Sequence, residues 1–190
     1  MGRVSQAQAR ENRERVVETA SRLFRALGTH VSVADLMKAA GLTHGGFYKQ
    51  FASKEALIDE ATAHAFAEFT QRYATALEQF SGRRDAAQQA FIDAYLSVEH
   101  RDAPADGCPL AALAGDMARE PGSQEARQVY TEGVGHFADW LATEDQDGII
   151  RLCTMLGALL LARATKDSPL SEEILTATRT ALAATAQSGT

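Results

Sequence analysis

The sequence predicts an all-α fold of about nine helices, and three observations support this prediction. Alanine is abundant, whereas the 190 residues include only four prolines, a balance that favours helices. Apolar side chains recur every three or four residues along most of the chain, which is the spacing of one helix face. No stretch alternates between apolar and polar residues for long enough to form a strand.

The first predicted helix covers residues 6–27 and ends before Gly28, which stands where a carboxyl-terminal cap belongs. A second, short helix begins after Ser32, because Asp35 three residues later completes a capping-box pattern. The apolar residues at helical spacing in these two helices are Val16, Ala20, Leu23, Phe24, Leu27, Val33, Leu36, Met37 and Ala40.

A tight turn at Gly41 leads to a third helix, which Thr43 caps and which runs to Phe51. Phe47 and Phe51 lie one helical turn apart, so we expect both rings to face inward. A long fourth helix follows over residues 54–80. Its apolar stripe consists of Leu57, Ala61, Ala65, Phe69, Tyr73 and Leu77.

Five more helices are predicted, at about residues 85–100, 109–120, 123–141, 148–165 and 171–186. The turn-forming run D-A-P-A-D-G (102–107) separates the first two, and Pro109 suits the first position of a helix. We expect residues 1–53 to form a three-helix head and residues 54–190 to form a helical bundle.

The two predicted domains differ in charge. The net charge of the chain is −6, yet residues 1–54 carry nine Lys and Arg against four Asp and Glu, and the remainder carries ten against 21. A basic head on an acidic body is expected where only the head approaches phosphate groups. The alternative is that alternating Arg and Glu in the first helix serve only to solubilise it.

Two short helices between two longer ones form a helix-turn-helix unit, in which the second short helix enters the DNA major groove. The run G-L-T-H-G-G-F-Y-K-Q-F-A-S-K-E-A-L, from Gly41 to Leu57, closely resembles the signature of the TetR/AcrR family of transcriptional regulators. The segment from Arg13 to Phe24 also resembles the R-x-R-[IV]-[IVL]-x-x-A-x-x-L-F motif of that family. The resemblance implies a DNA-binding head within a nine-helix fold.

The same resemblance implies which residues meet DNA. Tyr48 and Lys54 would hold phosphates, because the dipole of the helix that begins at Lys54 favours an anion there. Ser32 is a further phosphate candidate. The candidates for base edges or nearby phosphates are Thr43, His44, Gly45 and Lys49. Lys49 suits a guanine edge and a phosphate equally, and His44 is either a contact or an ordinary surface histidine.

Gly45 and Gly46 are unexpected inside a helix, because each costs about 1 kcal/mol relative to alanine. Close approach of the backbone to DNA, or to the first helix, explains them. A weak helix that the core tolerates is the other explanation.

One recognition helix makes too few contacts for specific binding, so such heads work as two-fold dimers on palindromic DNA. The predicted helix over residues 148–165 is apolar nearly all round, more than one core-facing side requires. A fully buried helix in a monomer would also explain this, but the resemblance favours a homodimer joined by a four-helix bundle. The expected interface residues are Leu156, Leu159, Leu160, Arg163, Ile174 and Leu182.

In the family, the helices of the body enclose a cavity for a small-molecule effector. The side chains expected to line it are Phe66, Phe69, Tyr73, Tyr95, Cys108, Met117, Tyr130 and Phe137. Aromatic residues at helical spacing also form ordinary cores, and no charged cluster indicates the charge of an effector.

Cys108 precedes Pro109, so we expect it at a helix N-cap, where amide donors and the helix dipole lower the pKa of a thiol. The run G-C-P-L-A-A-L also resembles a helix start in one branch of the family, some of whose members respond to electrophiles or oxidants. A modifiable thiol and a small buried residue or passive cap are the two alternatives for Cys108.

These features lead us to expect a ligand-responsive transcriptional regulator, a repressor that binds a double-stranded operator as a homodimer until a small-molecule effector releases it. A transcriptional activator of the same fold and a thiol-modification sensor acting through Cys108 are alternatives. An adaptor that keeps the head only for packing would need none of Tyr48, Lys49 and Lys54.

Other classes of protein are not indicated. The sequence has no phosphate loop, nucleophile elbow or metal-spaced set of His, Cys and carboxylates, so we expect no enzyme, cofactor or metal. The longest apolar stretch, residues 153–162, is shorter than the roughly 20 residues that span a bilayer. We find no signal peptide, and the two cysteines are too few for a disulfide framework, so we expect a cytoplasmic protein.

Overall fold

The computed structural model describes residues 6–119, 123–144 and 147–184 of the 190-residue chain. Within these ranges every regular element is a helix, so the all-α prediction is confirmed. The elements are α1 (Gln6–Leu27), α2 (Val33–Ala39), the 3₁₀ helix η1 (His44–Lys49), α3 (Lys54–Gln79), α4 (Arg84–Tyr95), α5 (Val98–Asp102), the 3₁₀ helix η2 (Pro104–Asp106), α6 (Pro109–Arg119), α7 (Gln124–Leu141), α8 (Gly148–Ala164) and α9 (Leu170–Ala184). Of the helices in the described ranges, none is long and apolar enough to cross a membrane.

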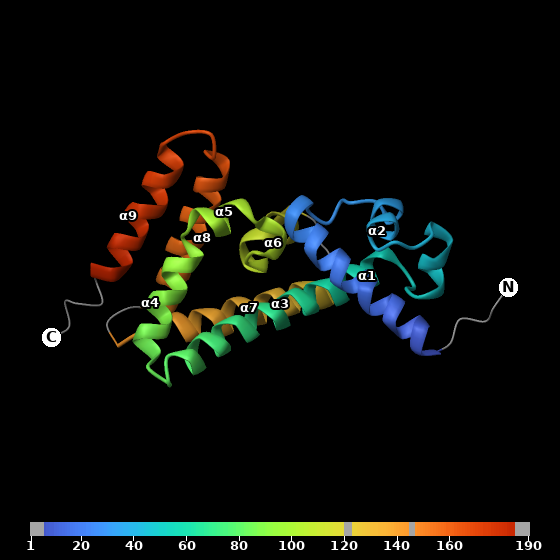
Figure 1. Cartoon of the computed structure of the whole chain (residues 1–190), viewed down its shortest axis with the longest axis horizontal. Coiled ribbons are helices and arrows are strands. Elements are labelled where there is room, and N and C mark those ends of the chain that lie inside the picture. Colours follow the sequence, from blue (N-terminus) through green and yellow to red (C-terminus); the bar gives the residue numbers. More distant parts are fainter. Residues whose placement is uncertain (1–5, 120–122, 145–146, 185–190) are drawn as a thin grey trace.

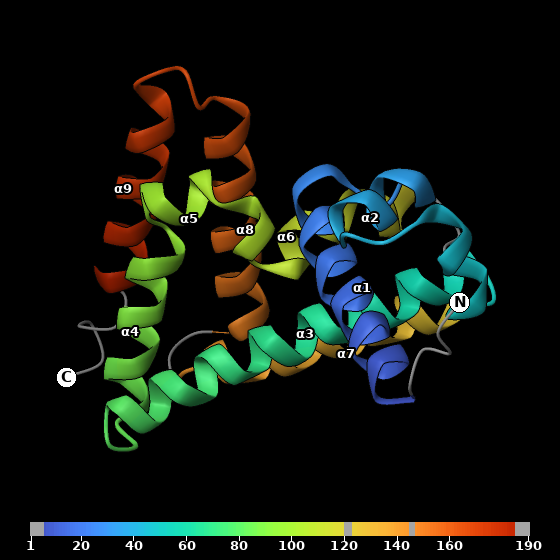
Figure 2. The ribbon, with the colours of Figure 1, turned by 45° about the vertical axis from the view of Figure 1, so that its right-hand side comes forward.

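Helix α3 forms a long axis that joins the two ends of the molecule (Figure 1). Helices α1 and α2 gather with η1 around its amino-terminal end, and we call this group, residues 6–53, the head. Helices α4, α8 and α9 lie toward its carboxyl-terminal end, and α7 runs alongside it in both ribbon views (Figure 2). We call the part from α3 to α9 the body.

Each end of the molecule has its own hydrophobic core, and α3 contributes to both. The head core contains Phe24, Leu36 and Phe47 together with Leu57 of α3. It also takes in Met117 of α6, so the head is packed against the body rather than tethered to it. The body core contains the α3 residues Phe66, Phe69 and Tyr73 with residues from α4 and from α6 through α9.

The caps predicted at Ser32 and Gly28 are confirmed, whereas Thr43, the predicted cap of the third helix, makes no side-chain hydrogen bond to it. The Ser32 hydroxyl accepts a hydrogen bond from the Asp35 amide at 3.1 Å, which starts α2. Ser53 does the same for Ala56 at 3.2 Å, which starts α3. Gly28 ends α1 with a φ of +85°, a left-handed conformation that glycine adopts without strain.

The predicted helix over residues 85–100 is interrupted in the structure. Helix α4 ends at Tyr95, and Ser97 caps the short α5 by accepting from the His100 amide at 3.1 Å. A serine side chain that satisfies backbone amides competes with continued helix, and this explains the break. The predicted ends of two other helices, at residues 120 and 186, lie outside the described residues.

The third predicted helix also differs from the prediction, because η1 is a 3₁₀ helix rather than an α-helix. Its hydrogen bonds span three residues, from the Gly46 amide to the Thr43 carbonyl at 2.9 Å and from the Gln50 amide to the Phe47 carbonyl at 2.8 Å. Gly45 and Gly46 lower the α-helix propensity there, and short 3₁₀ segments are common where an α-helix is poorly supported. Residues three apart therefore share a side of η1.

Candidate nucleic-acid interface

The seven residues predicted to meet DNA lie at one end of the molecule. Ser32 caps α2, Lys54 begins α3, and the other five belong to η1 or its cap. Because α2 and η1 pack against each other and α3 follows directly, these three elements present one surface. Lys54 is half-buried, and the exposed members are Ser32, Thr43, His44, Gly45, Tyr48 and Lys49.

Two buried rings anchor η1 and leave its outer side free. Phe47 is 0% and Phe51 3% exposed, as predicted, and their rings stack at 5.4 Å between centroids. The Tyr48 ring packs its edge on Phe47 at 5.1 Å and remains 67% exposed. The Tyr48 hydroxyl and the Lys49 ammonium therefore extend from a base that the head core holds in place.

Packing within the chain does not require glycine at position 45. A β-carbon on Gly45 would meet no atom within 4 Å, and one on Gly46 would lie 3.6 Å from the Met37 methyl, an ordinary contact. Close approach to the first helix therefore does not explain Gly45. Thr43 caps η1 without a side-chain hydrogen bond, so its hydroxyl is not used by the helix.

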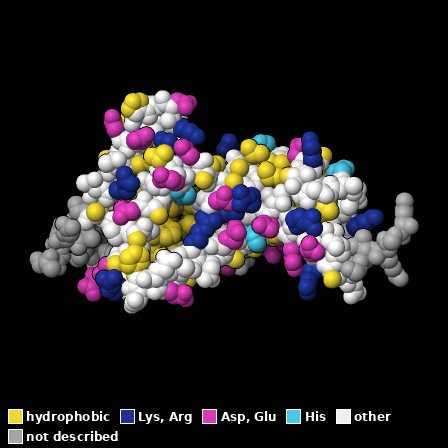
Figure 3. Space-filling view, in the orientation of Figure 1, with side chains coloured by type: hydrophobic (Ala, Val, Ile, Leu, Met, Phe, Trp, Pro, Cys, Tyr) yellow, Lys and Arg dark blue, Asp and Glu magenta, His cyan; other side chains and the backbone are white. Residues whose placement is uncertain are grey.

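The junction between head and body is built from arginines that sequence reasoning missed. The buried Arg25 of α1 donates to the Glu68 carboxylate of α3 at 2.8 Å and to the Gly107 carbonyl at 3.3 Å. Arg22 binds the carboxylate of Asp106, next to Gly107. Burial lowers the pKa of Arg25, and the Glu68 charge acts against that shift. Figure 3 shows Lys and Arg side chains, with acidic ones beside them, in the middle of the molecule.

Most of the residues predicted to line an effector cavity are packed together in the body core. Phe137 lies 4.8 Å from Phe69 and 5.5 Å from Tyr73, ring centroid to centroid. Met117 belongs to the head core, and Tyr130 lies between the cores with its hydroxyl donating to the Leu110 carbonyl at 2.9 Å. Burial raises the pKa of Tyr130 to about 12. The members that share the body core are Phe66, Phe69, Tyr73, Tyr95, Cys108 and Phe137.

Cys108 lies at the start of α6 as predicted, but its thiol is fully buried. Burial raises the pKa of Cys108, while the Tyr95 hydroxyl and the first amides of α6 act in the opposite direction. The prediction of a lowered pKa is therefore wrong, because desolvation of a thiolate outweighs the cap in this position.

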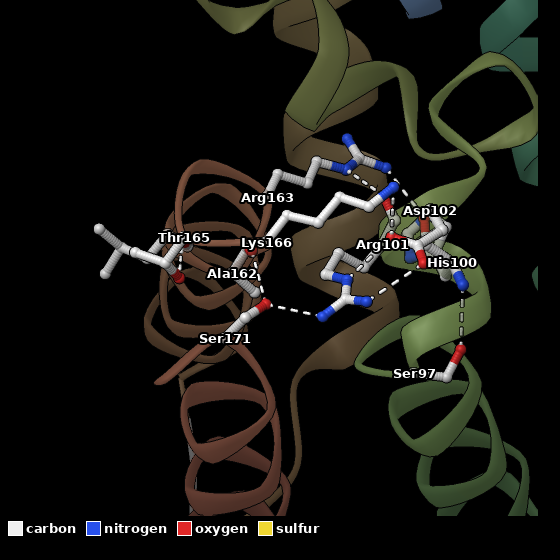
Figure 4. Close-up of polar contacts among 10 residues, drawn as sticks. Ser97, His100, Arg101, Asp102, Ala162, Arg163, Thr165, Lys166 and Ser171 are labelled. Carbon is white, nitrogen blue, oxygen red and sulfur yellow. Dashed lines mark hydrogen bonds and ion pairs between the residues drawn. The ribbon is translucent and has the colours of Figure 1, made fainter. Parts of the chain in front are cut away.

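A polar network connects α5 with α8 and α9 (Figure 4). Arg101 is buried and donates to the Ser171 hydroxyl at 2.8 Å and to both carboxylate oxygens of Asp102. This guanidinium, with the Lys166 ammonium acting in the same direction, lowers the pKa of Asp102 to about 2. Arg163 of α8 donates to the main-chain oxygens of His100 and Arg101, at 3.1 and 3.2 Å.

The predicted dimer residues divide into two groups. Leu159 and Leu182 are buried in the body core of one chain, so they have no surface to offer a second chain. Leu160 is 41% exposed, and the half-buried members are Leu156, Arg163 and Ile174. The exposed side of α8 carries further apolar residues that the prediction did not select, namely Ile149, Ile150 and Leu161.

Comparison with known proteins identifies the head and the fold. Residues 16–61 match the model of a family described as bacterial regulatory proteins, tetR family. A comparison with curated proteins finds no match. Among solved structures, the chain is similar to a TetR transcriptional regulator from Chloroflexus aurantiacus J-10-FL, with 25% identity, coverage of 94% of this chain and 96% of that one, and a TM-score of 0.76.

Two further structures extend the likeness in fold. A TetR-family regulator from Cytophaga hutchinsonii has 19% identity, coverage of 95% of this chain and 97% of its own, and a TM-score of 0.74. The reduced form of E. coli NemR has 20% identity, coverage of 90% of this chain and 96% of its own, and a TM-score of 0.73.

The environment of His100 predicts a pH-dependent stability. Its Nε2 accepts from the Cys108 amide at 3.2 Å, so the ring proton lies on Nδ1, 2.6 Å from the Tyr95 carbonyl. Burial lowers the pKa of His100 below 6.5, the charges of Arg163 and Arg72 act in the same direction, and the bond to Tyr95 opposes them. Since the unfolded chain takes up this proton at higher pH than the folded chain, the free energy of unfolding falls as the pH drops through 6.5.

We therefore expect His100→Gln to lose less thermal stability than the parent protein when the pH is lowered from about 7 to about 5. Thermal unfolding followed by circular dichroism at both pH values measures the difference. His44→Gln, at an exposed histidine, is the control and should behave like the parent. An equal decrease in all three proteins would contradict the prediction.

The burial of Cys108 predicts an unreactive thiol. In a Cys153→Ser variant, which leaves Cys108 as the single thiol, we expect Ellman's reagent to react only after denaturant unfolds the protein. The denatured sample provides the control, since it must release one equivalent of dye per chain. Rapid release of dye by the native Cys153→Ser variant would instead support a reactive Cys108 thiol.

Proposed function

Because the chain belongs to the TetR family of transcriptional regulators, we propose that it is a ligand-responsive repressor that binds a palindromic DNA operator as a homodimer. The observation that supports this most is the outer side of η1. There Tyr48 and Lys49 extend outward from buried anchors and remain exposed. A head kept only for packing has no use for them.

We assign the DNA contacts by their place on this surface. Tyr48 and Lys54 hold phosphates, with the amino-terminal end of α3 adding the favourable dipole for an anion. Ser32 is a weaker phosphate candidate, because its hydroxyl already donates to Asp35 at 2.6 Å. Thr43, with an unused hydroxyl, and Lys49 face bases or nearby phosphates. Gly45 lets the backbone of η1 approach the duplex closely.

Dimerisation would use the exposed side of α8. Leu161 is 57% exposed there, and Leu160, Ile149 and Ile150 are exposed as well. Apolar side chains along one face of a surface helix favour burial against a partner. Pairing through α8 and α9 would place two heads on the same face of a duplex, about 34–36 Å apart on successive major grooves.

Release of DNA would follow from binding of an effector within the body. The aromatic side chains there are uncharged, so the proposed effector is held mainly by apolar and aromatic contacts. Opening that interior displaces α3, whose first residue is Lys54, and changes the spacing of the two heads. We do not propose Cys108 as the sensor, because its thiol is buried and its pKa is raised.

Selection of DNA by the purified protein from a random-sequence duplex library tests this proposal. A repressor of this kind should enrich a palindrome with half-sites one helical turn apart. If the protein enriched no sequence from the library, the proposal of operator binding would be wrong. A site that overlaps a promoter would support repression, whereas a site upstream of the promoter would support activation.

Lys54→Ala should weaken binding to the selected palindrome and to unrelated duplex by the same factor, since a phosphate contact reads no sequence. The slope of log affinity against log salt concentration should become less steep by about 0.9, the value expected for the loss of one phosphate contact. Fluorescence anisotropy over a salt series measures both. Lys166→Ala, which removes a cation from the body, should change neither. An altered base preference would contradict the assigned role.

Leu161→Glu should convert the dimer to a monomer, because it places a charge in an apolar interface. Light scattering during size-exclusion chromatography measures the mass, and the variant should also lose tight binding to the palindrome. Leu27→Glu, at an exposed leucine of the head, is the matched control and should stay dimeric. A dimer that survives the Leu161 change would place the interface elsewhere.

A further inference from the structure

The recognition helix η1 has little stability of its own. It spans six residues, includes Gly45 and Gly46, and receives no side-chain bond from its cap Thr43. Helices of the 3₁₀ type also have poorer hydrogen-bond geometry than α-helices. The direction in which η1 presents its outer residues must therefore be fixed from outside.

The buried rings of Phe47 and Phe51 provide only part of that support. Phe47 lies on the buried side of η1 and Phe51 follows its C-cap Gln50, and apolar packing is largely non-directional. These rings determine how deeply η1 sits in the head. A directional contact at its carboxyl-terminal end adds to this support.

Arg13 of α1 makes a directional contact with that end. Its Nε donates to the main-chain oxygen of Gln50, the C-cap of η1, at 3.4 Å, and its guanidinium carbon lies 4.7 Å from the centroid of the Phe51 ring. Its two terminal nitrogens donate to the two carboxylate oxygens of Glu60 on α3, at 2.5 Å each. One side chain thus connects α1, the end of η1 and α3.

We propose that Arg13 is a positioning residue for DNA recognition, which fixes the tilt of η1 against α3. Tyr48 and Lys49 then face the same duplex as Lys54. This inference rests on the proposed function. Arg13 is no phosphate contact, because its guanidinium is directed at Glu60 and Gln50 within the protein.

The substitution Arg13→Lys distinguishes a positioning role of the guanidinium group from an effect of its positive charge. It keeps the positive charge but lacks the planar fork that binds two carboxylate oxygens and stacks on a ring. Glu60→Gln removes the carboxylate partner instead and leaves Arg13 unchanged. Arg10 lies three residues earlier on α1, is exposed and pairs with Glu14, so Arg10→Lys is the matched control.

The test compares two duplexes of equal length, the palindrome selected by the parent protein and a random sequence, over a salt series. We expect Arg13→Lys and Glu60→Gln each to lower affinity for the palindrome about tenfold, a change that titrations measure readily. Affinity for the random duplex and the salt slope should stay unchanged. Arg10→Lys should alter none of these quantities.

Two outcomes would overturn the inference. Equal losses on both duplexes with a shallower salt slope would make Arg13 a phosphate contact, and full affinity for the palindrome would show that η1 needs no such support. The amide signals of Gly45 and Gly46 in NMR spectra provide a readout without DNA. They should shift in Arg13→Lys and Glu60→Gln but not in Arg10→Lys, and unshifted signals would refute the role of Arg13 even if the parent protein selected no duplex.

Discussion

The structure depends on α3 as one unbroken helix that belongs to two hydrophobic cores. Leu57, near its start, is buried in the head core, and Phe69, three turns further on, is buried in the body core. A continuous helix is a rigid connection between the regions that it joins. The position of the head, and of the surface around Lys54, is therefore coupled to the packing of the body.

Charged groups then fix the register in which α1 lies on α3. Arg25, whose side chain is 1% exposed, pairs with Glu68 and also reaches the Gly107 carbonyl. Glu68 is partly exposed, so the pair contributes little net stability, but losing Glu68 would leave the buried guanidinium without its carboxylate, which is costly. Apolar contacts alone would tolerate a sliding helix. The arginines of the junction add directional contacts that favour the observed arrangement of head and body.

Features encoded by neighbouring residues were predictable from the sequence, and features made by distant residues were not. Caps such as Ser32 and Ser53 act within one turn, and the family motif is contiguous, so the head and its exposed residues followed directly. Arg13 and Glu60 stand 47 positions apart, and no spacing rule connects them. Burial likewise arises from the whole fold. It reversed the expected pKa shift of Cys108 and removed Leu159 from the predicted interface.

The division of η1 into an anchored side and a free side has a practical consequence. Phe47 alone among its six residues is buried, whereas His44, Gly45, Tyr48 and Lys49 are exposed. Substitutions at the exposed positions change the side chains that would face DNA, while the residues of the hydrophobic core stay the same. Under the proposed function, libraries at these few exposed codons can be sorted for new DNA preferences without changing the residues of the two cores.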